Sequence, residues 1–173
     1  MNDFSIIDGI AHINDPALYQ TWLDREDYKA AVAQADTPER TAVKRLLVDF
    51  EADLARIVRD DTVQENVVDV MNRYIVKDYV QHDPNAPGNG RDNIIEHFRN
   101  VPTGPGTPTP PPVVSVVLDG DLATVMMKQP TPDPENPGKT YDWYIVTVFR
   151  VRDGKLAEHW SAFRKMAAPM PGN

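Results

Sequence analysis

The sequence contains no cysteine and no long apolar run. The absence of cysteine among its 173 residues excludes disulfides, thiolate nucleophiles, and zinc or iron–sulfur sites with cysteine ligands. No apolar stretch approaches the roughly 20 residues that a membrane-spanning helix requires. The N-terminus, Met1–Phe4, has no basic segment typical of a signal peptide. We therefore expect a cytoplasmic protein with no membrane partner, folded by packing alone.

Basic residues are also scarce. The 18 Lys and Arg residues are outnumbered by 26 Asp and Glu residues, which gives a formal net charge of -8. An acidic surface repels phosphate backbones, so no nucleic-acid partner is expected. The four histidines have no metal-ligand spacing, and no glycine-rich phosphate loop is present. The sequence therefore predicts neither a metal site nor a cofactor.

The composition is that of one soluble globular domain, with 41% hydrophobic and 25% charged residues. The first half is typical of helices. Asp15-Pro16 and Thr37-Pro38-Glu39 are helix-start signals, Thr62 with Glu65 predicts a capping box, and a short helix is expected from about Asp92. The strongest helical pattern follows Thr37-Pro38-Glu39. It consists of about six turns of apolar residues at helical spacing: Val43, Leu46, Leu47, Phe50, Leu54, Ile57 and Val58.

The second half changes to runs of β-branched and aromatic residues. Asp119-Gly120 and Asp153-Gly154 are typical hairpin turns, and a proline-rich loop from Pro130 to Lys139 forms the junction between them. Helices followed by an antiparallel meander predict an α+β domain with helices on one face of a curved sheet. The expected strands are residues 113–118, 122–129, 140–151 and 155–165.

Two motifs connect these halves to a known family. Residues 79–84 read Tyr-Val-Gln-His-Asp-Pro, and residues 149–160 read Phe-Arg-Val-Arg-Asp-Gly-Lys-Leu-Ala-Glu-His-Trp. This pair resembles the SnoaL-like (polyketide cyclase-like) branch of the nuclear transport factor 2-like superfamily, over about Thr37 to Lys165. The resemblance implies a cone-shaped fold, in which a strongly curved antiparallel sheet wraps around N-terminal helices and leaves a cavity between them.

The same resemblance divides the chain into an N-terminal helical extension (residues 1–36), a SnoaL-like domain (residues 37–167) and a tail (residues 168–173). It also implies acid–base chemistry in the cavity, because related members close rings by aldol reactions, isomerise steroids, hydrolyse epoxides or dehydrate small molecules. Other members, including nuclear transport factor 2 itself, are not catalysts. The function therefore has to be argued from the residues of the site.

At four positions the chain departs from what the resemblance implies. An ionisable residue usually stands two places before the Phe-Arg pair, and an aspartate usually follows Glu-His-Trp. Here these positions hold Thr147 and Ser161. A histidine pair on the preceding strand is replaced by Met126 and Lys128. Neither the Thr147 nor the Ser161 hydroxyl acts as a base near neutral pH without an activating partner.

The length of the Asp153-Gly154 turn decides which side chains share the cavity. A two-residue turn places Thr147 opposite Trp160. A three-residue turn places Thr147 opposite His159 and Ile145 opposite Ser161, and we favour it because it brings both family positions to one face. That face would carry Tyr141, Trp143, Ile145, Thr147, Phe149, His159 and Ser161.

The expected catalytic residues are His82 and His159, because histidine changes its protonation near neutral pH. The alternative for His82 is a cap at a strand end, and the alternative for His159 is a packed core residue. The expected substrate-binding residues are Tyr141, Trp143, Thr147, Ser161 and Lys128. Strand aromatics are equally typical of a plain core, and a lysine near a strand end is typical of solvent contact.

The predicted function is a SnoaL-like enzyme that applies acid–base chemistry to a compact apolar carbonyl compound, as an aldol cyclase or isomerase does. The alternative is a non-catalytic module that binds a small ligand or associates as a dimer. A small apolar molecule in the cavity is the expected partner. We also expect a homodimer, because Tyr144, Val146 and Val148 give the long strand an apolar outward face.

Overall fold

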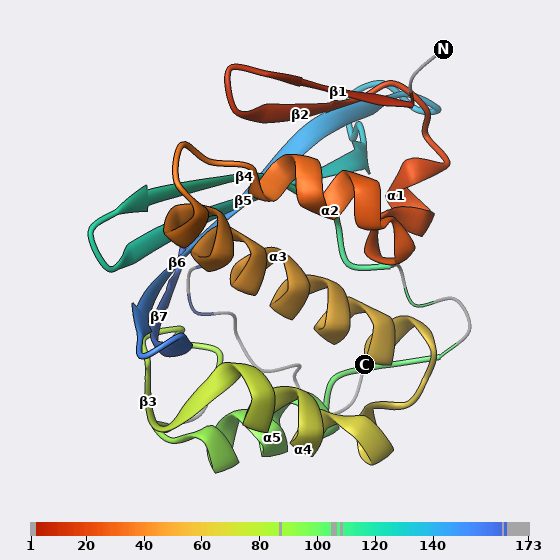
Figure 1. Cartoon of the computed structure of the whole chain (residues 1–173). Helices are drawn as coiled ribbons and strands as arrows, with labels where there is room; N and C mark the ends of the chain where they lie inside the picture. The colour runs from red at the N-terminus through yellow and green to blue at the C-terminus, as the bar shows by residue number, and fades with distance from the viewer. Residues whose placement is uncertain (1–2, 87, 105–106, 108, 164, 166–173) are drawn as a thin grey trace, which may run out of the picture.

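The computed structural model describes residues 3–86, 88–104, 107, 109–163 and 165 (Figure 1). The expected tail, residues 168–173, lies outside them. The helices are α1 (Leu18–Thr21), the short 3₁₀ helix η1 (Trp22–Asp24), α2 (Glu26–Ala33), α3 (Pro38–Arg59), α4 (Val63–Tyr74) and α5 (Arg91–Arg99). The strands are β1 (Phe4–Ile7), β2 (Ile10–Ile13), β3 (Ile75–Gln81), β4 (Val113–Asp119), β5 (Leu122–Pro132), β6 (Thr140–Arg152) and β7 (Lys155–Ser161).

The predicted α+β class is confirmed, and β4 to β7 form the expected antiparallel meander. The main sheet has the order β3-β7-β6-β5-β4, so β3 and β4 are its edges and the sheet is not closed. It twists strongly and wraps around α3 (Figure 1). β3 joins the sheet by pairing with β7 in parallel. The sequence did not predict this strand, because it follows α4 without an intervening turn and the apolar pattern runs on across the boundary.

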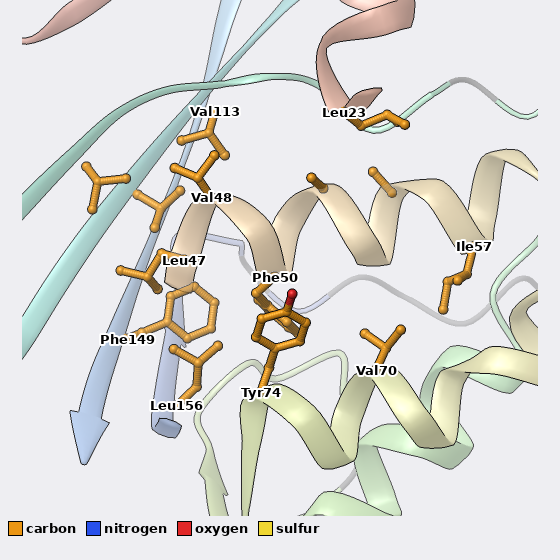
Figure 2. Packing of buried hydrophobic residues seen from close by; sticks show 14 of the residues in the cluster. Leu23, Leu47, Val48, Phe50, Ile57, Val70, Tyr74, Val113, Phe149 and Leu156 are labelled. Atoms are coloured by element: carbon orange, nitrogen blue, oxygen red, sulfur yellow. The ribbon is translucent and has the colours of Figure 1, made fainter. Parts of the chain in front are cut away.

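The long helix α3 begins as predicted, since the Thr37 hydroxyl accepts a hydrogen bond from the Arg40 backbone N–H. α4 also begins where expected, but Thr62 makes no side-chain capping hydrogen bond. Figure 2 shows Leu47 and Phe50 of α3 facing Phe149 and Leu156 of the sheet, with Tyr74 of α4 below them. The core therefore lies between α3, α4 and the concave face of the sheet.

The N-terminal extension contains the predicted helices, but it starts with a β1–β2 hairpin that the sequence analysis missed. Its Trp22, Leu23 and Tyr28 side chains are fully buried in the same core as α3 and the sheet. Several hydrogen bonds attach it beside the β4 edge. The Trp22 indole donates to the Pro110 carbonyl at 3.0 Å, and the Tyr28 hydroxyl donates to the Val113 carbonyl at 2.8 Å.

The prediction of a three-residue turn between β6 and β7 is wrong. Arg152 pairs with Lys155, and Asp153 and Gly154 form a two-residue turn with φ values of 51° and 72°. Ala157 is then an extra residue on β7, since Val151 pairs with Leu156 and Arg150 pairs with Glu158. This bulge places Thr147 opposite Ser161, two residues from the expected register. Because side chains alternate with a period of two, the face predicted for Thr147, His159 and Ser161 is unchanged.

Candidate functional site

A cavity of about 220 Å³ lies between α3, α5 and the inner face of the sheet. Apolar side chains form most of its wall, with Phe50 and Leu54 from α3 and Ile94 and Phe98 from α5. Figure 2 shows Phe50 beside Phe149 of β6, whose ring lies 6.0 Å away between centroids. The wall contributed by β5, β6 and β7 consists of Met127, Ile145, Thr147, Phe149, His159 and Ser161.

Three of the predicted site residues, Thr147, His159 and Ser161, therefore face one space. The Ser161 hydroxyl oxygen is buried, and no described atom makes a hydrogen bond to it. A buried hydroxyl without a partner costs free energy unless something else satisfies it. Ser161 thus offers an unused hydrogen-bonding group at the cavity wall.

Tyr141 and Trp143 lie on the same face of β6 but nearer its start, beyond the cavity. They keep 47% and 40% of their surface exposed, and neither belongs to the cavity lining. The Trp143 ring packs edge-on against Phe163, with 6.5 Å between centroids, and Phe163 does line the cavity. Trp143 therefore contacts a residue of the cavity wall but does not itself line the cavity.

The structure places Lys128 on the outer face of the sheet. Met127 points into the cavity, so its strand neighbour Lys128 points away. The Lys128 ammonium pairs with the Asp142 carboxylate at 2.9 Å. Tyr144 and Val146, which suggested the homodimer, are exposed. The homodimer itself stays a prediction.

His82 also lies on the outer face. Its Nε2 atom is 2.8 Å from the Glu158 carboxylate, and its ring stacks on Trp160 with 5.0 Å between centroids and an interplanar angle of 6°. Trp160 alternates with His159 and Ser161 along β7, so it faces away from the cavity. The cavity lining accordingly does not include His82.

His159 occupies a hydrogen-bond network at the cavity wall. Its Nδ1 atom lies 2.7 Å from the Gln81 side-chain oxygen, and that oxygen also accepts the Asp83 backbone N–H at 2.9 Å. Its Nε2 atom contacts the Thr147 hydroxyl. Burial lowers the pKa of His159 to about 4. The imidazole is therefore neutral at physiological pH.

Glu51 lines the cavity together with Asp83 and His97, and none of these three ionisable residues was among the predicted site residues. Glu51 projects from α3 into the cavity lining, and no described residue forms a hydrogen bond or ion pair with its carboxyl group. Burial raises the pKa of Glu51 to about 7. Tyr79 lies nearby, and burial together with the Glu51 charge raises the pKa of its hydroxyl.

A signal for Glu51 was present in the sequence. Glu51 is four residues after Leu47 and three before Leu54, so it interrupts the apolar stripe of α3 at helical spacing. A charged residue inside such a stripe is rarely buried without a reason. A search for charged positions within the apolar stripe, rather than for apolar positions alone, would have found it.

Within the described ranges, no group of three or more His, Asp or Glu side chains is arranged to hold a metal ion. None of the described helices combines the length and apolar character needed to cross a bilayer. Glu51 and the Thr147–His159–Gln81 network line the same cavity.

Comparison with known proteins gives a family match. A family model described as a SnoaL-like domain matches residues 54–159, which is more than half of the chain and includes the first sequence motif and all but the last residue of the second. No curated protein matches.

Solved structures with a similar fold include three described as putative polyketide cyclases. One from Bacillus cereus ATCC 10987 is 16% identical, with a TM-score of 0.45 over 73% of this chain and 76% of that one. One from Acidithiobacillus ferrooxidans is 17% identical, with a TM-score of 0.45 over 73% and 89%. One from Sinorhizobium meliloti is 18% identical, with a TM-score of 0.42 over 72% and 94%.

Proposed function

Because the chain belongs to the SnoaL-like domain family, we propose that it is an enzyme acting by proton transfer on a compact, largely apolar carbonyl compound in this cavity. Glu51 is the group that moves the proton. The observation that carries the proposal is an isolated carboxyl group in an apolar cavity with its pKa raised to about 7.

A carboxyl group with this pKa suits the chemistry. Near pH 7 the protonated and ionised forms of Glu51 are present in similar amounts, so it can both take and return a proton. An ordinary glutamate is almost fully ionised at this pH and is a weaker base. No described cation neutralises the Glu51 carboxylate, so its reactivity is not blocked by an ion pair.

The reaction follows from this arrangement. The Glu51 carboxylate removes a proton from the carbon beside the carbonyl, the C–H electron pair forms a carbon–carbon double bond, and the carbonyl π electrons move to oxygen. The Ser161 hydroxyl, to which no described atom makes a hydrogen bond, donates a hydrogen bond to that enolate oxygen. The protonated Glu51 then returns the proton to carbon. Isomerisation or aldol closure requires the same first step.

The cavity size limits the substrate. Its volume of about 220 Å³ is below the roughly 300–1,000 Å³ of pockets for drug-sized ligands. A compact molecule of one or two rings suits this volume and the largely apolar wall.

The test follows exchange of carbon-bound protons in heavy water by NMR, using a panel of small cyclic ketones and β-dicarbonyl compounds. We expect Glu51→Gln to lower the exchange rate of the best panel member by about 100-fold or more. The matched control is Glu39→Gln, an exposed position on the same helix, which should leave the rate unchanged. Full exchange activity in Glu51→Gln would overturn the role of Glu51.

The rate should also depend on pH. The rate constant kcat/KM for proton abstraction should rise with pH through a transition near pH 7, because only the ionised carboxylate accepts a proton. Carbon NMR of the labelled carboxyl group gives the pKa of Glu51 directly. A carboxyl group that titrates near 4.5, its ordinary value, would contradict the proposal.

A further inference from the structure

The Gln81 side chain fixes which nitrogen of His159 carries the proton. The Gln81 oxygen accepts the Asp83 backbone N–H, which can only donate, so the amide orientation is determined. The His159 Nδ1 atom, 2.7 Å from the same oxygen, must then be the donor of that contact. Because burial keeps His159 neutral, its Nε2 atom carries no proton and is an acceptor.

This assignment orients the Thr147 hydroxyl. Its one proton has two possible acceptors, His159 Nε2 and the Trp160 carbonyl oxygen at 3.0 Å. If the proton went to the carbonyl, the lone pairs of Thr147 Oγ1 and His159 Nε2 would face each other across the shorter of the two contacts, which is less favourable than lone pairs that face the carbonyl oxygen at 3.0 Å. The Thr147 proton therefore points to Nε2. Thr147 lines the cavity, so a ligand there is the group to which its oxygen can offer a lone pair.

We propose that Gln81 is a positioning residue that holds His159 in the Nδ1–H form and so makes Thr147 a hydrogen-bond acceptor toward the cavity. Ser161 lies opposite Thr147 on the neighbouring strand, and its hydroxyl, which has no hydrogen-bond partner among the described residues, can donate. An acceptor and a donor side by side match a ligand with a hydroxyl or enol group next to its carbonyl oxygen. The substrate class is thus a hydroxy or enolisable dicarbonyl compound, and this part rests on the proposed function.

The first experiment needs no substrate. Long-range proton–nitrogen NMR distinguishes the two neutral forms of histidine, and the signals of His159 are assigned by their loss in His159→Gln. At pH 7 we expect wild-type His159 in the Nδ1–H form, although free histidine favours the Nε2–H form. An Nε2–H signal in the wild type would overturn the proposal, whether or not Glu51 transfers protons.

Variants of Gln81 test whether this side chain determines which nitrogen of His159 carries the proton. Gln81→Leu removes the acceptor, so His159 should change to the Nε2–H form. Gln81→Glu keeps an oxygen in place and should retain the Nδ1 proton. Gln34→Leu, at an exposed position, is the control and should change nothing. An Nδ1–H form that persists in Gln81→Leu, with circular dichroism showing a folded chain, would refute positioning by Gln81.

Ligand preference is the second readout. Chemical-shift titration compares a cyclic α-hydroxy ketone with its methyl ether, which cannot donate. We expect the hydroxy compound to bind about three- to tenfold more tightly, the range for one net hydrogen bond. Thr147→Val should abolish this preference. Equal binding of the two probes by the wild type, or a preference that survives in Thr147→Val, would overturn the assignment of Thr147 as acceptor.

Discussion

Thr147 and Ser161 are cross-strand neighbours with similar side chains, but their hydroxyl groups are in different states. The Thr147 hydroxyl contacts His159 and the Trp160 carbonyl, whereas no described atom makes a hydrogen bond to the Ser161 hydroxyl. Removing a buried polar group that has no partner does not remove an interaction. The two residues should therefore respond differently to mutation.

We predict that Ser161→Ala leaves the free energy of unfolding unchanged or raises it by up to about 1 kcal/mol, because it removes a buried polar group that no described atom pairs with. The matched control is Ser115→Ala, which removes a hydroxyl that donates to the Gly9 carbonyl at 3.0 Å. This control should lower the free energy of unfolding by about 1 kcal/mol. Urea unfolding measures both. Equal destabilisation by the two variants would mean that the Ser161 hydroxyl is paired.

At the residue scale the sequence predicted part of the site. Thr147, His159 and Ser161 were found because motif positions and strand alternation are local properties. The outward position of His82 could not be derived, since it depends on the pairing of β3 with β7, a contact between segments far apart in the chain. The raised pKa of Glu51 likewise depends on which elements enclose it.

At the scale of elements, the β6–β7 hairpin positions the sheet wall of the cavity. Its turn requires two consecutive residues in left-handed conformation, Asp153 and Gly154. The bulge at Ala157 then shifts the pairing by one residue. Turn and bulge together determine that Thr147 lies opposite Ser161. The Asp-Gly pair was recognisable in the sequence, but the bulge has no comparable local signal.

Gly154→Ala should destabilise the protein by about 1 kcal/mol. A Cβ atom at this position meets no other atom within 4 Å, so the cost comes from the left-handed backbone rather than from a clash. Asp153→Asn is the control, since asparagine suits the first position of this turn, and it should be close to neutral. Thermal unfolding compares the two. An unchanged melting temperature for Gly154→Ala would show that the turn conformation differs.

The other elements show where local signals are sufficient. α3 was predicted from its first residues through six turns because its cap, proline and apolar stripe all agree. The β1–β2 hairpin was missed although its turn, Asp8-Gly9, carries the same signal as Asp153-Gly154. Each of its strands has only four residues, too few for a clear alternation.

At the scale of the whole molecule, the change from helical to strand periodicity was enough to predict the α+β class. The location of the N-terminal extension was not predictable, because the contacts of Trp22 with Pro110 and of Tyr28 with the first residue of β4 join residues more than 80 positions apart. The extension, the sheet and α3 share one buried core, so their stability is coupled. A charge buried at the cavity should therefore affect the unfolding of the whole chain.

Glu51 and His159 should make the free energy of unfolding depend on pH in opposite directions. The pKa of Glu51 rises from 4.5 to about 7 on folding, so its contribution to stability is present below pH 4.5 and is lost as pH rises to 7. The pKa of His159 falls from 6.5 to about 4, so its contribution is present above pH 6.5 and is lost as pH falls to 4. Between pH 4.5 and 6.5 the two effects nearly cancel.

In Glu51→Gln the free energy of unfolding should therefore rise with pH between pH 4.5 and 6.5, by up to about 1.4 kcal/mol per pH unit. In His159→Gln it should fall over the same range. Urea unfolding at several pH values measures these slopes, with Glu39→Gln expected to follow the wild type. Parallel curves for all four proteins would mean that neither group changes its pKa on folding.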